Sequence, residues 1–146
     1  MTAAKRILFA TDLSPASRPA FDEALRVAQG GADLILAHAY AVPNLGEPLA
    51  LAPHAYDEID HKLRQDAERR LDVLVAEARR RGIDARAIVI LGDPYEAISR
   101  TAKDEGVDLV VMGTHGRTGV ARFFVGSVAS RVIATSPCPV LTVRAA

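Results

Sequence analysis

Short apolar runs alternate along this chain with segments whose apolar residues recur at helical spacing, and this alternation most constrains the fold. A run of four to eight apolar residues between turn signals is typical of a buried strand. The five runs are residues 7–10, 34–40, 85–91, 107–112 and 140–143. Strands that alternate with helices in this way form parallel sheets. The sequence therefore predicts an α/β fold: a single domain with an open five-stranded parallel sheet and helices on both faces.

Capping residues predict where four helices begin and end. Ser14 provides an N-cap for the first helix, Pro15 its first helical position and Gly30-Gly31 its end. Residues 57–81 form the longest expected helix, because their apolar residues follow one another at steps of three and four. The third helix is expected between Asp93 and Gly106, with Asp93 as N-cap and Pro94 as its first residue. The fourth is expected over residues 128–135, with Ser127 as N-cap.

The handedness of the crossovers restricts the order of the strands. Helices cover both faces only if the chain runs in one direction through its first three strands and then returns for the last two. This argument predicts the order 3-2-1-4-5, with the reversal between the first and the fourth strand. Ligands of open parallel sheets bind outside the carboxyl ends of the strands at such a reversal. Asp12, after the first strand, is therefore expected opposite Gly113, after the fourth.

The composition excludes several classes of function. The 146 residues include 18 Lys and Arg and 18 Asp and Glu, so no net field attracts nucleic acid or an anionic membrane. No apolar run approaches the length of a transmembrane helix, and the N-terminus lacks the apolar core of a signal peptide. Cys138 is the single cysteine, and His38, His54 and His61 have no metal-ligand spacing with it. We therefore expect a cytoplasmic protein with no nucleic-acid partner, no membrane partner and no structural metal.

A glycine-punctuated segment follows the fourth expected strand and contains Gly113, Gly116 and Gly126, with Ser127 after the last glycine. It leads into a helix, whose first N–H groups and positive dipole end favour a phosphate. Glycines also allow the backbone to approach a ligand closely. The segment has neither the Gly-x4-Gly-Lys-Ser/Thr of a P-loop nor the Gly-x-Gly-x-x-Gly of a dinucleotide site. It predicts a phosphate site; the alternative is that the glycines serve chain geometry alone.

The spacing Gly-x2-Gly-x9-Gly-Ser resembles the nucleotide-binding signature of the universal stress protein family. The similarity runs from Ile7 to Val143 and includes residues 10–14, His38-Ala39, Gly92-Asp93-Pro94, residues 110–116 and Cys138-Pro139-Val140. It implies one universal stress protein domain over residues 1–146, with a Rossmann-like fold of the adenine nucleotide alpha hydrolase type. It also implies that the chain binds ATP, AMP or ADP, together with Mg2+.

The resemblance assigns roles to the residues at matching motif positions. Ala10, Thr11 and Asp12 would line the adenosine side, and the backbone of Ala39 would meet the adenine. Ala39 is smaller than the aliphatic residue often found there. The ribose would be flanked by Met112 and Gly113, and the phosphates would be held by Gly116, Gly126, Ser127 and Val128.

Some of these residues have a second interpretation. Asp12 also suits a cap for the first helical region, and Ser127 suits an N-cap whether or not a ligand is bound. Arg117 and Arg122 either neutralise phosphate charge, which makes Arg117 a candidate nucleotide contact, or face water. His115 invites an acid–base role, but no second catalytic group stands at a defined spacing, so we assign it to loop geometry.

These observations favour a nucleotide-dependent regulator of a stress response over an enzyme. Efficient phosphoryl transfer needs a base or a water-positioning group, and the sequence offers phosphate ligands without a clear base. We therefore expect no catalytic residues and at most slow ATP hydrolysis. The alternatives are a weak ATPase or self-phosphorylating enzyme, and a nucleotide-free protein interaction module.

Two segments are candidate partner surfaces. Residues 140–143 form an apolar strand at one edge of the expected sheet, and exposed edges are usually paired or protected. The resemblance implies a homodimer in which this strand pairs antiparallel with its twin. Residues 41–56 connect the second strand to the long helix, and their length makes them a candidate lid or partner surface.

Overall fold

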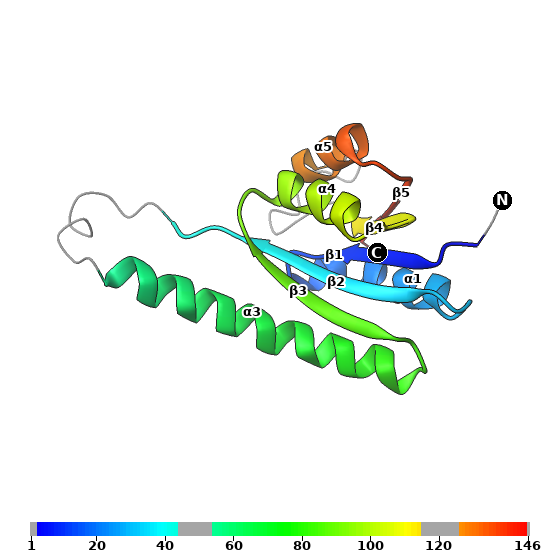
Figure 1. Cartoon of the computed structure of the whole chain (residues 1–146), viewed down its shortest axis with the longest axis horizontal. Coiled ribbons are helices and arrows are strands. Elements are labelled where there is room, and N and C mark those ends of the chain that lie inside the picture. The colour runs from blue at the N-terminus through cyan, green and yellow to red at the C-terminus, as the bar shows by residue number, and fades with distance from the viewer. Residues whose placement is uncertain (1–2, 44–53, 115–125, 146) are drawn as a thin grey trace.

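A computed structural model describes residues 3–43, 54–114 and 126–145, and it contains the predicted strands and helices (Figure 1). The strands are β1 (Arg6–Ala10), β2 (Asp33–Tyr40), β3 (Ala85–Leu91), β4 (Leu109–Gly113) and β5 (Val140–Val143). The helices are α1 (Arg18–Ala28), α3 (Ala55–Arg80), α4 (Pro94–Asp104) and α5 (Ser127–Thr135), and a 3-10 turn, η1 (Pro15–Ser17), precedes α1.

The five strands form one sheet in the order β3-β2-β1-β4-β5, and all neighbouring strands are parallel. This is the predicted order. The chain moves outward from β1 to β3 and then crosses back to the other side of β1. Ala10, the last residue of β1, is in register with Ala37 on one side and Met112 on the other. The reversal therefore places the carboxyl ends of β1 and β4 next to each other.

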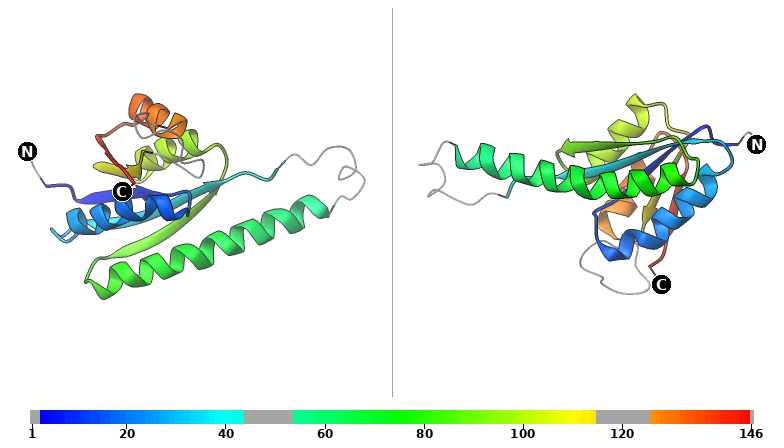
Figure 2. Two further views of the ribbon diagram at one scale, coloured as in Figure 1. Left: turned by 180° about the vertical axis from the view of Figure 1, so that it is seen from behind. Right: turned by 90° about the horizontal axis from the view of Figure 1, so that it is seen from below.

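Helices cover both faces of the sheet, with α1 and α3 on one face and α4 and α5 on the other (Figures 1 and 2). The central strand β1 is buried on both faces, so its successive side chains enter two separate cores. Phe9 packs in the core that contains Phe21 of α1 and Leu71 of α3. Leu8 packs in the core that contains Ile98 of α4 and Val132 of α5.

The first helix begins later than predicted. Ser14 and Pro15 start the 3-10 turn η1, in which the N–H of Ser17 donates to the carbonyl of Ser14 at 3.1 Å, and α1 begins only at Arg18. Leu13, just before the turn, has a φ of +65°, which reverses the chain direction at the end of β1. Ser14 and Pro15 are thus the N-cap and the first residue of a helical turn, as predicted, but this turn is 3-10 and the α-helix itself starts three residues later, at Arg18.

The N-cap of α5 is Gly126, so the prediction of Ser127 as the N-cap was wrong by one residue. Gly126 has extended dihedrals, with φ −60° and ψ 160°, and its carbonyl accepts a hydrogen bond from Ser130 N at 3.0 Å. Ser127 is already the first helical residue. A capping hydroxyl must belong to the non-helical residue before the helix, so the Ser127 hydroxyl does not cap α5.

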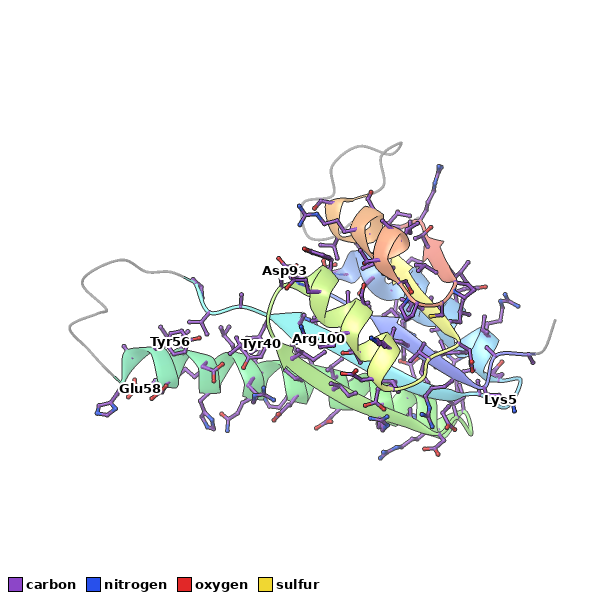
Figure 3. The ribbon with its side chains drawn as sticks, turned by 45° about the horizontal axis from the view of Figure 1, so that its top comes forward. Lys5, Tyr40, Tyr56, Glu58, Asp93 and Arg100 are labelled. Atoms are coloured by element: carbon purple, nitrogen blue, oxygen red, sulfur yellow. The ribbon has the colours of Figure 1, made fainter. Side chains whose placement is uncertain are left out.

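Helix α3 is only half packed against the sheet. Of its predicted apolar stripe, Ala67, Leu71, Val75 and Ala78 are buried. Leu63, nearer the start of the helix, is 36% exposed. The amino-terminal half extends past the end of the sheet, where Tyr56 and Glu58 lie far from the other helices (Figures 1 and 3). The connection before α3, predicted over residues 41–56, ends at His54, and residues 44–53 lie outside the described part of the chain.

Candidate functional site

A cavity of about 240 Å3 lies at the carboxyl ends of β1 and β4, where the strand order reverses. Its wall comes from the ends of three strands and from the first turns of α4 and α5. Among the described residues, nine of the predicted site residues line it: Ala10, Thr11, Asp12, Ala39, Met112, Gly113, Gly126, Ser127 and Val128. The other two predicted residues, Gly116 and Arg117, lie outside the described ranges, as does His115.

Backbone pairing continues past the end of β1 and fixes Thr11. The N–H of Thr11 donates to the carbonyl of Ala37 at 3.0 Å. The Nδ1 atom of the buried His38 lies 2.9 Å from the carbonyl oxygen of Thr11. Both contacts join the end of β1 to the end of β2. The floor of the cavity is therefore a continuation of the sheet.

Asp12 follows Thr11 and lines the cavity while it stabilises the turn before η1. Its Oδ1 atom accepts hydrogen bonds from the N–H of Ser14, at 2.9 Å, and from the Ser14 hydroxyl, at 2.6 Å. The two interpretations left open by the sequence are thus compatible, since one carboxylate caps the turn and borders the cavity. Asp12 adds negative charge to this side of the cavity.

The opposite wall is made by the end of β4 and the start of α5. Thr114 N donates to the carbonyl of Val143 at 3.0 Å, and Gly126 N donates to the carbonyl of Thr114 at 2.6 Å. These bonds hold the start of α5 beside the end of β4. Gly126, Ser127 and Val128 all border the cavity, so the amino-terminal end of α5, the positive end of its dipole, lies along it. Such a helix start suits an anion.

Comparison with known proteins identifies the family. The model of the universal stress protein family matches residues 3–144. This chain belongs to the universal stress protein family. A universal stress protein from Thermus aquaticus is 38% identical over 144 residues, which cover 96% of this chain and 98% of the relative.

Solved structures of universal stress proteins have the same fold. UspA from Lactobacillus plantarum superposes with a TM-score of 0.80 at 29% identity, and the match covers 99% of this chain and 100% of UspA. A universal stress protein solved in complex with cAMP superposes with a TM-score of 0.66 at 26% identity, over 99% of this chain and 100% of the other. The family assigned from the glycine spacing and the predicted strand order are therefore both confirmed.

Six residues of this universal stress protein line the cavity without having been predicted: Ser17, Ala37, Pro94, Ile98, Thr114 and Ala129. Ala37 lies two residues before Ala39 on β2, so strand periodicity could have identified it. Pro94 and Ile98 lie one turn apart at the start of α4, whose N-cap, Asp93, was recognised from the sequence (Figure 3). No pattern indicated that α4 packs beside β2 and α5, so its role in the cavity was missed.

A second cluster joins the end of β2 to the amino-terminal half of α3. The hydroxyl of Tyr40, at the end of β2, donates to Asp60 of α3, and the guanidinium of Arg64 lies 5.7 Å from the centre of the Tyr40 ring. Burial, followed by the hydrogen bond to Asp60, raises the pKa of the Tyr40 hydroxyl above its usual value. The hydroxyl therefore remains a donor at neutral pH. Tyr40 follows Ala39 directly, so this cluster also holds the end of β2 in place (Figure 3).

Within residues 3–43, 54–114 and 126–145, no three His, Cys, Asp or Glu side chains come together as a metal site. No helix in these same ranges combines the length and the apolar character that a bilayer crossing requires.

Proposed function

We propose that this protein binds an adenine nucleotide, namely ATP, ADP or AMP with Mg2+, in the cavity between β1 and β4. Occupancy of the cavity would regulate a stress response in the cytoplasm. The observation that carries the proposal is the arrangement of two features around one cavity at the strand reversal. The carboxylate of Asp12 lies at the end of β1, and the amino-terminal end of α5 lies across from it.

Different residues of the cavity wall suit the adenine, the ribose and the phosphates of such a ligand. Small or apolar residues, among them Ala10, Ala37, Ala39 and Ile98, give the cavity an apolar wall that suits an adenine ring. Asp12 can accept hydrogen bonds from ribose hydroxyls, and Met112 and Gly113 would flank the same sugar. The start of α5 would hold phosphates through Gly126, Ser127 and Val128, joined by Gly116 and Arg117. The related universal stress protein solved with cAMP supports an adenine nucleotide as the ligand class.

Mg2+ would enter with the nucleotide. Because Mg2+ retains several waters and is commonly held by substrate phosphates, it needs few protein ligands. Asp12 is the carboxylate among the described lining residues, and it already accepts two hydrogen bonds from Ser14. A general base for rapid phosphoryl transfer is therefore not provided by the described wall, and we propose binding with at most slow hydrolysis.

The first test is nucleotide analysis of the purified protein, followed by calorimetric titration with Mg2+-ATP and with AMP. Ser127→Ala removes a hydroxyl from the proposed phosphate side and should weaken Mg2+-ATP binding roughly three- to tenfold, the range for one hydrogen bond. Ser130→Ala is the matched control, since Ser130 lies exposed one turn further along α5, outside the cavity wall. Gly113→Val should abolish binding by filling the ribose position.

The proposal fails if the wild-type protein neither carries nucleotide nor binds Mg2+-ATP or AMP saturably. Equal affinities of the Ser127→Ala and Ser130→Ala variants would instead contradict the assigned phosphate position. Such an outcome would leave adenine binding intact and move the phosphates elsewhere in the cavity.

A further inference from the structure

The segment that connects β1 to η1 forms a thin wall between two spaces. On one side Thr11, Asp12 and Ser17 line the cavity described above. On the other side Thr11 and Ser17, together with Leu13, line a shallower groove beneath α3. The position of this wall sets where the Asp12 carboxylate meets a ligand. A residue that contacts this segment from the groove side therefore also affects the shape of the cavity.

Leu13, within this wall, has an unfavourable backbone conformation. Its φ is +65°, and among the described residues it alone has a positive φ without being glycine. A side chain with a Cβ atom is disfavoured in this left-handed region, and leucine has no polar group with which to stabilise it. Such a conformation persists only when surrounding contacts impose it. The wall would therefore relax if those contacts were removed.

Contacts within the segment account for part of this restraint. The N–H of Leu13 donates to Oγ1 of Thr11 at 2.9 Å, and the same Oγ1 lies 2.9 Å from Oγ of Ser17. The N–H of Ser14 donates to Asp12 at 2.9 Å. These bonds pair the N–H groups of Leu13 and Ser14. They leave the carbonyl of Leu13 to a residue from another element.

That residue is Arg70, in the middle of α3. Its Nη2 atom donates to the carbonyl oxygen of Leu13, across 57 positions of sequence. The Nη1 atom lies 3.8 Å from the Asp66 carboxylate one turn earlier, which orients the guanidinium toward the segment. A hydrogen bond from a charged donor is stronger than a neutral one. Arg70 thus fixes the peptide that follows the strained residue.

We propose that Arg70 is a positioning residue for the nucleotide cavity. By holding the Leu13 carbonyl it keeps the segment in its left-handed turn and so keeps the Asp12 carboxylate at the cavity edge. This inference rests on the proposed function. It makes the affinity for nucleotide depend on a contact from α3, a helix that contributes no described residue to the cavity wall.

The test compares two neighbouring arginines of α3. Arg70→Met should raise the Kd for Mg2+-ATP by up to roughly tenfold, which is less than the full strength of a charge-assisted hydrogen bond because the Arg70 side chain is 46% exposed and the bond also forms without nucleotide. Arg69→Met is the matched control, because the Arg69 side chain is 77% exposed and contacts Asp66 at 3.5 Å. It should change the Kd less than about twofold. Arg70→Lys keeps a cationic donor and should recover part of the affinity. An unchanged Kd in Arg70→Met would overturn the inference.

A second comparison separates positioning from general destabilisation. Glycine adopts a φ of +65° without strain, so Leu13→Gly should make the restraint from Arg70 less necessary. The Arg70→Met change should then cost less affinity in the Leu13→Gly background than in the wild type. Equal costs in both backgrounds would show that Arg70 acts on folding in general, and would overturn the inference.

Hydrogen exchange makes the test independent of nucleotide. In nucleotide-free protein, the amides of Leu13 and Ser14 should exchange faster in Arg70→Met than in Arg69→Met, because both amides donate within the restrained segment. Unchanged exchange would overturn the inference whether or not ATP binds. Failure of the wild-type protein to bind Mg2+-ATP would instead contradict the proposed function, so the two failures are distinguishable.

Discussion

At the scale of single residues, the Asp108 carboxylate shows how a side chain joins distant segments. Asp108 lies just before β4 and accepts hydrogen bonds from the backbone N–H groups of Lys5, at 2.9 Å, and Arg6, at 3.0 Å. Its own N–H donates to the carbonyl of Arg6 at 2.9 Å. These contacts fix the start of β1 against the start of β4. The donated hydrogen bonds, that from Lys5 first, hold the pKa of Asp108 below its usual value.

We predict that Asp108 contributes stability only above acidic pH. Because its pKa is lower in the folded protein, the contribution is complete above the unfolded-state pKa, about 4, and is lost as the pH falls through the folded-state value. Asp108→Asn should therefore lower the Tm at pH 7, and the difference from wild type should shrink below about pH 4. Thermal unfolding followed by circular dichroism at both pH values checks this. Asp72→Asn, at an exposed position of α3, is the control.

The contribution of Asp108 would be contradicted by a Tm difference that stays constant down to pH 3, about one unit below the usual pKa of aspartic acid. It would also be contradicted if Asp72→Asn reproduced the pH dependence. The first result would show that the effect does not depend on ionisation of the carboxyl, and the second would assign it to net charge and not to the two backbone hydrogen bonds.

At the scale of elements, α3 combines a packed half and a projecting half in one continuous helix. Leu71 is fully buried against the sheet, whereas Leu63, two turns earlier, is 36% exposed. Both belong to the same apolar stripe, so the difference comes from the length of the sheet and not from the helix itself. In the projecting half, Asp60 and Arg64 both contact Tyr40 at the end of β2.

We predict that the same substitution has different effects in the two halves of α3. Leu71→Ala removes a buried side chain and should cost about 2–5 kcal/mol of unfolding free energy. Leu63→Ala should cost less, about 1 kcal/mol, because 36% of Leu63 is already exposed and its burial is incomplete. Urea denaturation of both variants measures the difference. Equal losses would show that the amino-terminal half is covered in solution by another surface.

At the scale of the whole molecule, β5 is one edge of the sheet, and its four residues are all partly exposed. The carbonyls of Pro139 and Val143 accept hydrogen bonds from Val110 and Thr114, at 3.0 Å each. Since backbone groups of successive strand residues point to opposite sides, Val140 and Thr142 direct theirs away from β4. We propose that these groups pair antiparallel with β5 of a second copy, forming a homodimer.

We predict that Thr142→Pro converts such a dimer to a monomer. Proline removes the outward N–H of residue 142 and leaves the hydrogen bonds to β4 in place, which is why edge strands tolerate it. Thr142→Val is the matched control, because valine keeps the N–H and the branched shape. Analytical ultracentrifugation at micromolar concentration measures the assembly. A monomeric wild type, or a Thr142→Pro variant that remains dimeric, would contradict pairing through β5.

The features that follow from periodicity, capping and handedness could be predicted from the sequence. Strand β3 has the predicted bounds, and Asp93 caps α4 through the N–H of Tyr95 at 3.1 Å. The strand order followed from right-handed crossovers, so Asp12 was expected opposite Gly113 and lies with it in one cavity. These features are local, or depend on rules that hold for any parallel sheet.

The features that depend on contacts between distant segments could not be predicted from the sequence. The exposure of Leu63 depends on where the sheet ends, and the place of Ile98 in the cavity depends on how α4 packs. The left-handed conformation of Leu13 is held by Arg70, which is 57 residues away, and no local pattern encodes such a pair. Hydrophobic periodicity states which residues are buried but not which partners they meet, because that choice is made by the packing of the whole chain.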